Sequence, residues 1–307
     1  MTSAVLPPPV RPGDRVGVAA LSGPVDPAKL DRGLATLERL GFEAVPAANL
    51  ASRHGLFAGS DDERLEAFHA LAADPSVRAV VFARGGYGAL RVLPRIDWHL
   101  LARHPRAYVG YSDLTPFLLA VVQRLGRIAF HGPMVATELA RGLDEREERS
   151  FLCALSGDLE GARYPVAGWL RRGPAEGVLL GGCLSLLTAV QGTPWAPDPT
   201  HAILFWEDVD EPLYRLDRML THLGLSDTLP SIRGMVIGDC RPTDAPGPDE
   251  PAGVARLAEA LGSWAWPVAH GLEAGHCAPN LTLPLGAPVR LDPAAGALVV
   301  KPLHTER

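Results

Sequence analysis

Two periodicities alternate along the first half of the chain. Continuous apolar runs that are typical of buried strands lie at residues 15–21, 43–46, 79–83 and 107–110. Apolar residues at helical spacing fill two of the stretches between these runs, 28–40 and 61–73. Strands that alternate with helices in this way predict a parallel sheet covered by helices.

The pattern changes after residue 140. Asp144 and Glu147 form a capping box for a helix over 144–157, and Gly, Pro and Arg dominate the stretch from there to Gly173-Pro174. We therefore expect a first domain at 1–140, a connecting segment at 141–173 and a second domain at 174–307.

Short apolar segments separated by glycine and proline make up the second half. They read GVLLGG, AILFWED, GMVIGD, PVRLD and ALVVKPL. Helical patterns at 213–223 and 254–261 interrupt them, and 243–253 is rich in turn residues. This pattern predicts a compact β-rich domain, and we expect a small barrel.

Composition excludes several classes of protein. The chain has 307 residues, which favours two domains, and its net charge of −6 gives no basic surface for nucleic acid or for an anionic membrane. No apolar run approaches a membrane span, and prolines break the N-terminal stretch, so we expect a cytoplasmic protein. The cysteines lie far apart, which favours reduced thiols over a disulfide frame or a zinc site: Cys153, Cys183, Cys240 and Cys277.

Candidate chemistry gathers where two expected strands end. Ligands bind beyond the carboxyl ends of parallel strands, and the loops 84–88 and 110–113 lie there. Ser112 precedes a helix that we expect to begin with Thr115 as N-cap and Pro116 in the first position. Two interpretations are open: a nucleophile that faces an oxyanion hole, or a serine and two glycines that only form turns. The pattern Gly-Tyr-Ser-Asp-Leu lacks the second glycine of a nucleophile elbow.

A reactive serine needs a base and an acid. Among ten histidines, His131 and His276 stand beside glycine in expected loops, and spacing cannot choose between them. Four acids in five positions follow the run AILFW. Pro212 opens the next helix, so we expect Asp210 and Glu211 to serve as its N-terminal cap and as partners of its dipole, which leaves Glu207 unexplained. We expect neither a metal nor another cofactor, since no metal-binding motif such as H-E-x-x-H occurs.

The motifs together resemble the LD-carboxypeptidases, also called muramoyltetrapeptide carboxypeptidases. They occur in the order VFARGGYGALRVLPRIDW, YVGYSDLT, FHGPM, LLGGCLSLL, GTPW, ILFWEDVDEPLYRLDRMLTHLG and GHCAPNLTLPLGAPVRLD, along nearly the whole chain. The resemblance implies a Ser–His–Glu triad with Ser112 as nucleophile, His276 as general base and Glu207 as acid. It also implies an oxyanion hole made by the backbone N–H groups of Gly86 and Asp113.

The same resemblance implies a fold, a substrate and an assembly. The fold is α/β, with a Rossmann-like N-terminal domain and a smaller C-terminal β-barrel-like domain. The substrate is a cytoplasmic murein tetrapeptide that loses its terminal D-alanine during cell-wall recycling, and the assembly is a homodimer. We add the hypothesis that Arg84 binds the free carboxylate of the substrate.

Two other functions remain open. One is the microcin-immunity branch of the same family, whose members are serine hydrolases that cleave a peptidyl-aminoacyl adenylate analogue. The other is a non-catalytic two-lobed ligand-binding protein. The chain also departs from many relatives at Cys183, where we expect asparagine, and Cys277 directly follows the proposed base.

Overall fold

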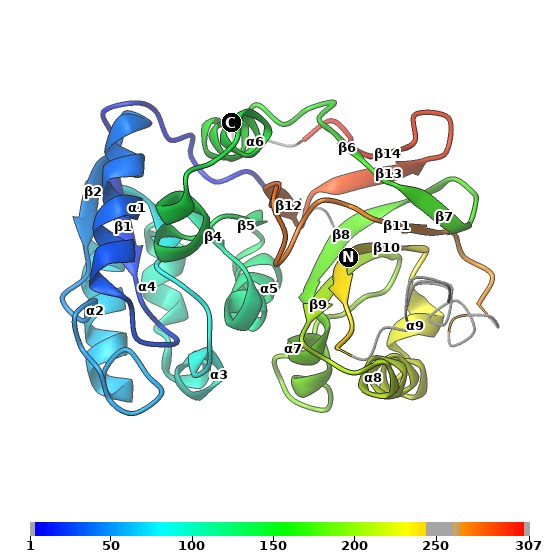
Figure 1. Ribbon diagram of the computed structural model, residues 1–307, viewed down its shortest axis with the longest axis horizontal. Helices are drawn as coiled ribbons and strands as arrows, with labels where there is room; N and C mark the ends of the chain where they lie inside the picture. Colours follow the sequence, from blue (N-terminus) through cyan, green and yellow to red (C-terminus); the bar gives the residue numbers. More distant parts are fainter. Residues whose placement is uncertain (1–3, 244–260, 262–263, 304–307) are drawn as a thin grey trace.

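Two sheets stand side by side, each covered by helices (Figure 1). The computed structural model describes residues 4–243, 261 and 264–303. The expected helix at 254–261 and most of the expected loop at 243–253 lie outside these residues.

The first sheet is parallel except at one edge. Its order is β12-β5-β4-β3-β1-β2, and only β12 runs antiparallel to its neighbour. This doubly wound order has its switch point between β1 and β3, where ligands bind in such sheets. The strands are β1 (Arg15–Ala19), β2 (Glu43–Pro46), β3 (Val77–Phe82), β4 (Ala107–Gly110), β5 (Ala129–His131) and β12 (Leu283–Leu285).

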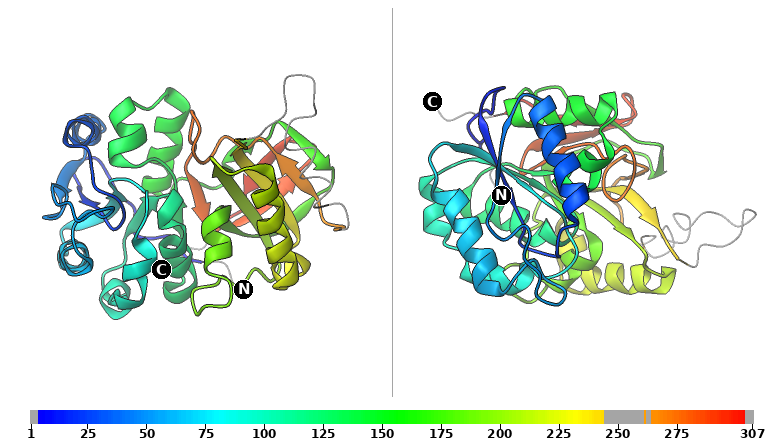
Figure 2. Two further views of the ribbon diagram at one scale, coloured as in Figure 1. Left: turned by 60° about the horizontal axis from the view of Figure 1, so that its bottom comes forward. Right: turned by 60° about the vertical axis from the view of Figure 1, so that its left-hand side comes forward.

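The helices of this part cover both faces of the sheet. The chain passes from β1 outward to β2 and then back to β3, so right-handed crossovers place α1 and α2 on opposite faces (Figure 2). Local signals set the starts: Asp26 caps α1, and Ser60 with Glu63 forms a capping box on α2. The elements are α1 (Pro27–Arg39), α2 (Asp61–Ala73), α3 (Ala89–Val92), η1 (Leu93–Arg95), α4 (Trp98–Arg103), η2 (Ser112–Leu114), α5 (Thr115–Leu125) and η3 (Val135–Leu139).

Thr115 is not the N-cap of α5, so that prediction is wrong. The short helix η2 already occupies the three preceding residues, and Thr115 is the first residue of α5. Its hydroxyl instead accepts a hydrogen bond from the backbone N–H of Cys183, at 3.0 Å. The side chain that we expected to serve the helix therefore joins it to the second sheet.

The second sheet is mixed and strongly curled. Its order is β6-β14-β13-β8-β9-β10-β11-β7, with a parallel centre from β8 to β11. Although β6 and β7 lie at opposite ends of this order, only Val166 and Ala167 separate them in the sequence. The N–H of Val166 donates to the carbonyl oxygen of Gly296, and the N–H of Ala167 donates to that of His270. The strands are β6 (Arg163–Pro165), β7 (Gly168–Arg171), β8 (Ala175–Cys183), β9 (Ala202–Val209), β10 (Gly234–Arg241), β11 (Val268–His270), β13 (Pro288–Asp292) and β14 (Ala297–Val300).

The expected α/β class, with a parallel sheet and a second β-rich part, is confirmed. The segment 141–173 carries α6 (Glu145–Ser156), with the expected capping box, and also contributes β6 and β7 to the second sheet. Within the described part of the chain, three further helices accompany that sheet: α7 (Leu184–Ala189), α8 (Leu213–Leu225) and α9 (Thr228–Ser231). We keep the domain boundaries near 140 and 173 as a proposal.

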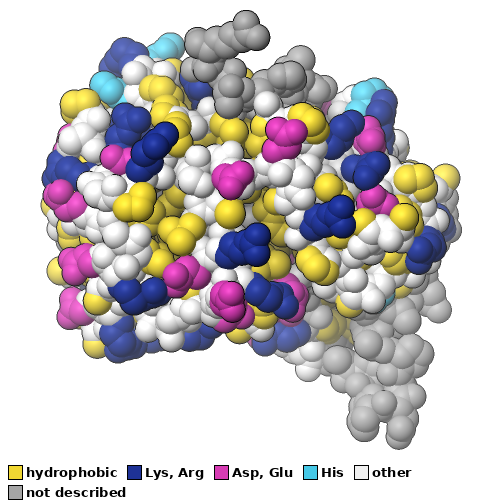
Figure 3. All heavy atoms as spheres, turned by 90° about the horizontal axis from the view of Figure 1, so that it is seen from above, with side chains coloured by type: hydrophobic (Ala, Val, Ile, Leu, Met, Phe, Trp, Pro, Cys, Tyr) yellow, Lys and Arg dark blue, Asp and Glu magenta, His cyan; other side chains and the backbone are white. Residues whose placement is uncertain are grey.

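Two surface properties follow from the described residues. None of their helices combines the length and the apolar character that a membrane span requires. On the face that Figure 3 shows, basic and acidic side chains are interspersed, so this face has no extended region of one sign.

Candidate active site

Ser112 lies on a sharp turn at the carboxyl end of β4. Its φ of 61° lies in the left-handed region, which is unfavourable for a serine and turns its side chain out of the path of the strand. The glycine loop after β3 packs directly against it. A Cβ atom on Gly85 would come within 2.9 Å of Ser112 Oγ, so the close approach of the two loops requires glycine there.

His276 joins Ser112 to a buried acid. Its Nε2 lies 3.2 Å from Ser112 Oγ, and its Nδ1 lies 2.7 Å from Oε2 of Glu207, which is completely buried near the end of β9. A carboxylate only accepts hydrogen bonds, so Nδ1 carries the proton and Nε2 of the neutral ring is free to accept one from the serine. The structure thus brings three predicted residues into one hydrogen-bonded chain across the two sheets.

Charge around His276 favours its protonated form. Burial by itself lowers the pKa of His276, but the hydrogen bond and the negative charge of Glu207, together with Asp208 and Glu138, outweigh burial and raise the pKa above its ordinary value. Burial raises the pKa of Glu207, and the contact with His276 opposes that rise. The pair is therefore set to stabilise an imidazolium when His276 takes up a proton.

The loop that carries His276 is fixed by residues that the sequence did not single out. The backbone N–H of Gly275 donates to Oδ1 of the buried Asn280, at 2.9 Å. The N–H of Asn280 donates in turn to Glu147 at the start of α6, at 2.7 Å. Arg241 holds the other side of the loop through the carbonyl oxygen of His276. Asn280 was visible in the motif GHCAPN, but its partners lie far away in the sequence.

The two residues expected to form an oxyanion hole lie beside Ser112. Gly86 is exposed with a φ of 112°, in the glycine loop that touches the serine. Asp113 follows Ser112 directly, and its buried carboxylate accepts from the N–H of Ala89 at 2.8 Å, which ties the two loops together. Burial raises the pKa of Asp113. Both loops therefore converge on the serine.

Arg84 lies at the switch point of the first sheet. It is half-buried, and its Nη1 donates to the carbonyl oxygen of Pro24 at 3.0 Å. The adjoining N–H of Gly23 donates to Gly85 at 3.1 Å. Arg84 therefore joins the glycine loop to the segment after β1, next to Ser112, and its binding of a substrate carboxylate stays a hypothesis.

Neither ring nitrogen of the other histidine candidate has a hydrogen-bond partner among the described residues. His131 is completely buried on β5, and its ring packs at 4.9 Å on Phe205 and at 5.5 Å on Tyr111. Burial lowers the pKa of His131 to about 3, so it is neutral at physiological pH. The structure brings His276, and not His131, to Ser112.

The acids after Glu207 do not cap α8, so the cap part of that prediction is wrong. Pro212 occupies the N-cap position with no side-chain cap, and Asp210 two residues earlier has a φ of 61°. Glu211 instead accepts from Arg215 in the first turn of the helix, at 3.2 Å. Asp208 is buried and accepts from the N–H groups of Ser185 and Val209. Within the described ranges, no group of three or more His, Cys, Asp or Glu side chains is arranged to hold a metal ion.

Two cysteines lie next to the chain of three residues. Cys183 is buried opposite Glu207, with its Sγ 3.1 Å from Ser185 Oγ and 3.7 Å from Asp208 Oδ2. The Sγ of Cys277 donates to the carbonyl oxygen of Pro279 at 3.0 Å, and burial raises the pKa of that thiol to about 12. Both thiols are therefore protonated, poor nucleophiles.

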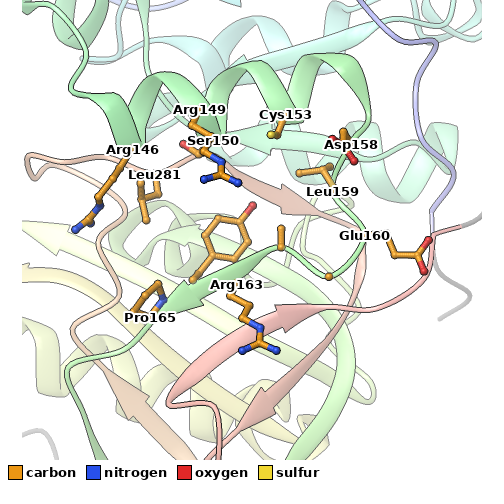
Figure 4. Close-up of a pocket in the computed structure, with 13 residues that line it drawn as sticks. Arg146, Arg149, Ser150, Cys153, Asp158, Leu159, Glu160, Arg163, Pro165 and Leu281 are labelled. Carbon is orange, nitrogen blue, oxygen red and sulfur yellow. The ribbon is translucent and has the colours of Figure 1, made fainter.

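A cavity of about 560 Å³ lies between α6 and β6 (Figure 4). It is separate from the hydrogen-bonded residues Ser112, His276 and Glu207. Its lining mixes three arginines with two acids, namely Arg146, Arg149, Arg163, Asp158 and Glu160. Ser112, Glu207 and His276 do not line it. Because opposite charges share one open space, the lining selects no single class of ligand.

Comparison with known proteins shows that both halves of the chain match domains of one protein family. Residues 16–132 match the LD-carboxypeptidase N-terminal domain, and residues 176–291 match the LD-carboxypeptidase C-terminal domain. The chain is 36% identical over 298 residues to the probable murein peptide carboxypeptidase of Bacillus subtilis, which covers 94% of this chain and 92% of that protein. It is 32% identical over 290 residues to the murein tetrapeptide carboxypeptidase of Pseudomonas aeruginosa, with coverage of 91% and 93%.

Solved structures share the fold. The muramoyltetrapeptide carboxypeptidase from Oxalobacter formigenes matches with a TM-score of 0.85 at 31% identity, over 95% of this chain and 100% of that one. The microcin C7 self-immunity protein MccF in its wild-type apo state matches with a TM-score of 0.89 at 24% identity, over 98% and 100%. At that identity the second likeness concerns the fold alone.

Proposed function

This chain belongs to the LD-carboxypeptidase family and is a serine-type LD-carboxypeptidase, and we propose that it releases the terminal D-alanine from murein tetrapeptides. The observation that carries this proposal is the hydrogen-bonded chain from Glu207 through His276 to Ser112. Turnover of cell-wall fragments in the cytoplasm and assembly as a homodimer are parts of the same proposal, and both come from the family resemblance.

Ser112 is the nucleophile in this proposal and His276 is its base. Nε2 of His276 takes the proton of Ser112 Oγ, and the oxygen attacks the carbonyl carbon of the L,D-peptide bond. Glu207 keeps the proton on Nδ1, so that Nε2 faces the serine, and it stabilises the imidazolium that forms. Its complete burial strengthens this interaction, since little solvent screens it.

The glycine loop and the start of η2 supply the oxyanion hole. The backbone N–H groups of Gly86 and Asp113 bind the oxygen that becomes negative as the tetrahedral intermediate forms. A single donor of this kind contributes roughly 3–4 kcal/mol in comparable sites. The close approach of the glycine loop supports this assignment, because a Cβ atom on Gly85 would lie 2.9 Å from Ser112 Oγ and 3.5 Å from the backbone nitrogen of Asp113.

Three proton transfers then complete the cycle. The imidazolium of His276 donates its Nε2 proton to the departing amine, and D-alanine leaves while the remaining tripeptide is esterified to Ser112. Water, deprotonated by the same nitrogen, attacks the ester, and the serine regains its proton from His276. The products are a tripeptide with a free carboxylate and D-alanine, and the enzyme is unchanged.

Substrate choice is tested by offering two substrates to the wild-type protein. Murein tetrapeptide and a peptidyl-aminoacyl adenylate analogue are incubated separately at neutral pH, and products are identified by mass spectrometry. We expect D-alanine and tripeptide from the first and no cleavage of the second. Cleavage of the adenylate analogue alone would assign the chain to the microcin-immunity type of activity.

A further inference from the structure

A second buried carboxylate lies behind the proposed triad. Glu138, in η3, is only 7% exposed, and three donors hold it. Its Oε1 accepts from the hydroxyl of Tyr111 at 2.8 Å. Its Oε2 accepts from the N–H of Met134 at 3.0 Å and from the hydroxyl of Thr137 at 2.6 Å. Both oxygens are thus occupied as acceptors, which suits an ionised carboxylate.

Tyr111 connects Glu138 to the base. The centres of the Tyr111 and His276 rings lie 4.9 Å apart, and the ring planes meet at 71°. Such an edge-to-face contact between two rings is attractive. Tyr111 is buried and directly precedes Ser112. Its ring therefore contacts the base, and its backbone is bonded to that of the nucleophile.

We propose that Glu138 and Tyr111 are positioning residues for His276. Glu138 fixes the tyrosine hydroxyl, the tyrosine ring then limits rotation of the imidazole, and the carboxylate adds negative charge near His276. The inference rests on the proposed role of His276 as general base. It gives the imidazole a lateral support in addition to the hydrogen bond at Nδ1.

The electrostatic surroundings agree with this arrangement. Glu138 contributes, after Glu207 and Asp208, to the rise in the pKa of His276. Arg141 faces Glu138 from the segment after η3 and is itself paired with Glu147. The titratable and charged groups nearest to His276 and its loop are Ser112, Tyr111, His131, Glu138, Glu207, Asp208, Asp239, Arg241 and Cys277.

Glu138→Gln removes the negative charge of this side chain while it keeps the shape of the side chain. The amide still accepts from the N–H of Met134 and still meets the tyrosine hydroxyl, but the negative charge is gone. We expect the imidazole of His276 to titrate at lower pH than in the wild type, and kcat to fall about ten- to hundredfold, as for a misplaced catalytic group, with KM unchanged. Glu176→Gln is the matched control, because it removes one carboxylate at the end of β8 remote from the site.

Tyr111→Phe separates the hydroxyl from the ring. It keeps the contact with His276 and the charge of Glu138 but releases the hydrogen bond between them. We expect kcat to fall without the downward shift in the titration of His276. If Glu138→Gln does not fold, Tyr111→Phe still tests the positioning role, since a wild-type kcat in Tyr111→Phe overturns the inference.

The titration is measured without substrate, by NMR on protein with ¹³C-labelled histidine, and His276→Gln identifies the signal. If the wild type releases no D-alanine, the proposed function fails, and the titration still decides the inference. A His276 signal in Glu138→Gln that titrates as in the wild type overturns it, even if kcat falls together with thermal stability. A downward shift there, with Glu176→Gln unchanged, supports it.

Discussion

The protonation state of His276 governs the pH range of activity. The imidazole must be neutral to accept the serine proton, and Glu207, Asp208 and Glu138 raise its pKa above the ordinary value despite burial. Activity is therefore lost as the pH falls through this raised pKa. We expect kcat/KM to increase with pH up to that value and to level off above it, on the alkaline side of an unperturbed histidine.

Glu207→Gln tests the cause of that shift. The substitution removes the main raising contribution, so the acidic limb of the kcat/KM profile moves to lower pH. The amide also no longer fixes the tautomer of His276, and kcat falls by roughly 10⁴-fold, as in comparable triads. Steady-state kinetics between acidic and neutral pH measure both effects. An acidic limb that stays in place would show that Glu207 does not set the pKa of His276.

Arg84 tests recognition of the substrate carboxylate. Its guanidinium lies beside the glycine loop, and loss of one charge-assisted hydrogen bond costs roughly 1.5–3 kcal/mol. We expect Arg84→Leu to raise KM for D-alanine-terminated peptides by about tenfold or more. Arg84→Lys, which keeps the charge, retains part of the affinity. A wild-type KM in Arg84→Leu removes this hypothesis.

At the scale of elements, a hydrogen bond joins the start of α5, three residues after Ser112, to the second sheet. The hydroxyl of Thr115 accepts from the N–H of Cys183, where β8 ends, and both residues are buried. Thr115→Val leaves that N–H unpaired, at a cost of about 1–3 kcal/mol in the free energy of unfolding. Urea unfolding measures it. Thr115→Ser keeps the acceptor and should stay close to the wild type. A loss in Thr115→Ser with wild-type stability in Thr115→Val would show that the methyl group, and not the hydroxyl, matters.

Elements with strong local signals were predictable from the sequence. The strands at 43–46 and 107–110, the helix at 61–73 and the capping box of α6 agree with the structure because neighbouring residues determine them. The strands β5, β6, β7, β11 and β12 were missed. β12 has only three residues, and its partner β5 lies far earlier in the chain, with Leu283 opposite His131. No local pattern carries such a pairing.

The residues of the candidate site likewise fall into those that the sequence indicated and those that it did not. Ser112, Glu207 and His276 were found because their motifs resemble a family, whereas spacing alone left two histidines open. Tyr111, Glu138 and Asn280 were missed, since each acts through a contact between distant segments. Thr115 was found but given the wrong partner, because its bond to Cys183 exists only once the two sheets pack.

At the scale of the whole molecule, the candidate site exists only where the two sheets meet. Ser112 follows a strand of the first sheet, while Glu207 lies on the second and His276 on a loop that runs between them. β12, from the second half of the chain, completes the first sheet and holds that loop at its far end. The relative position of the two sheets therefore sets the distance between nucleophile and base.

The most direct test of this account compares wild type and Ser112→Ala in one assay. Purified proteins are incubated with murein tetrapeptide, and released D-alanine is quantified by mass spectrometry. We predict release by the wild type and a loss of roughly 10⁶-fold in kcat for the variant, as for other serine nucleophiles. Comparable release by Ser112→Ala would contradict the account, since the hydrogen-bonded chain would then end on a residue that the reaction does not use.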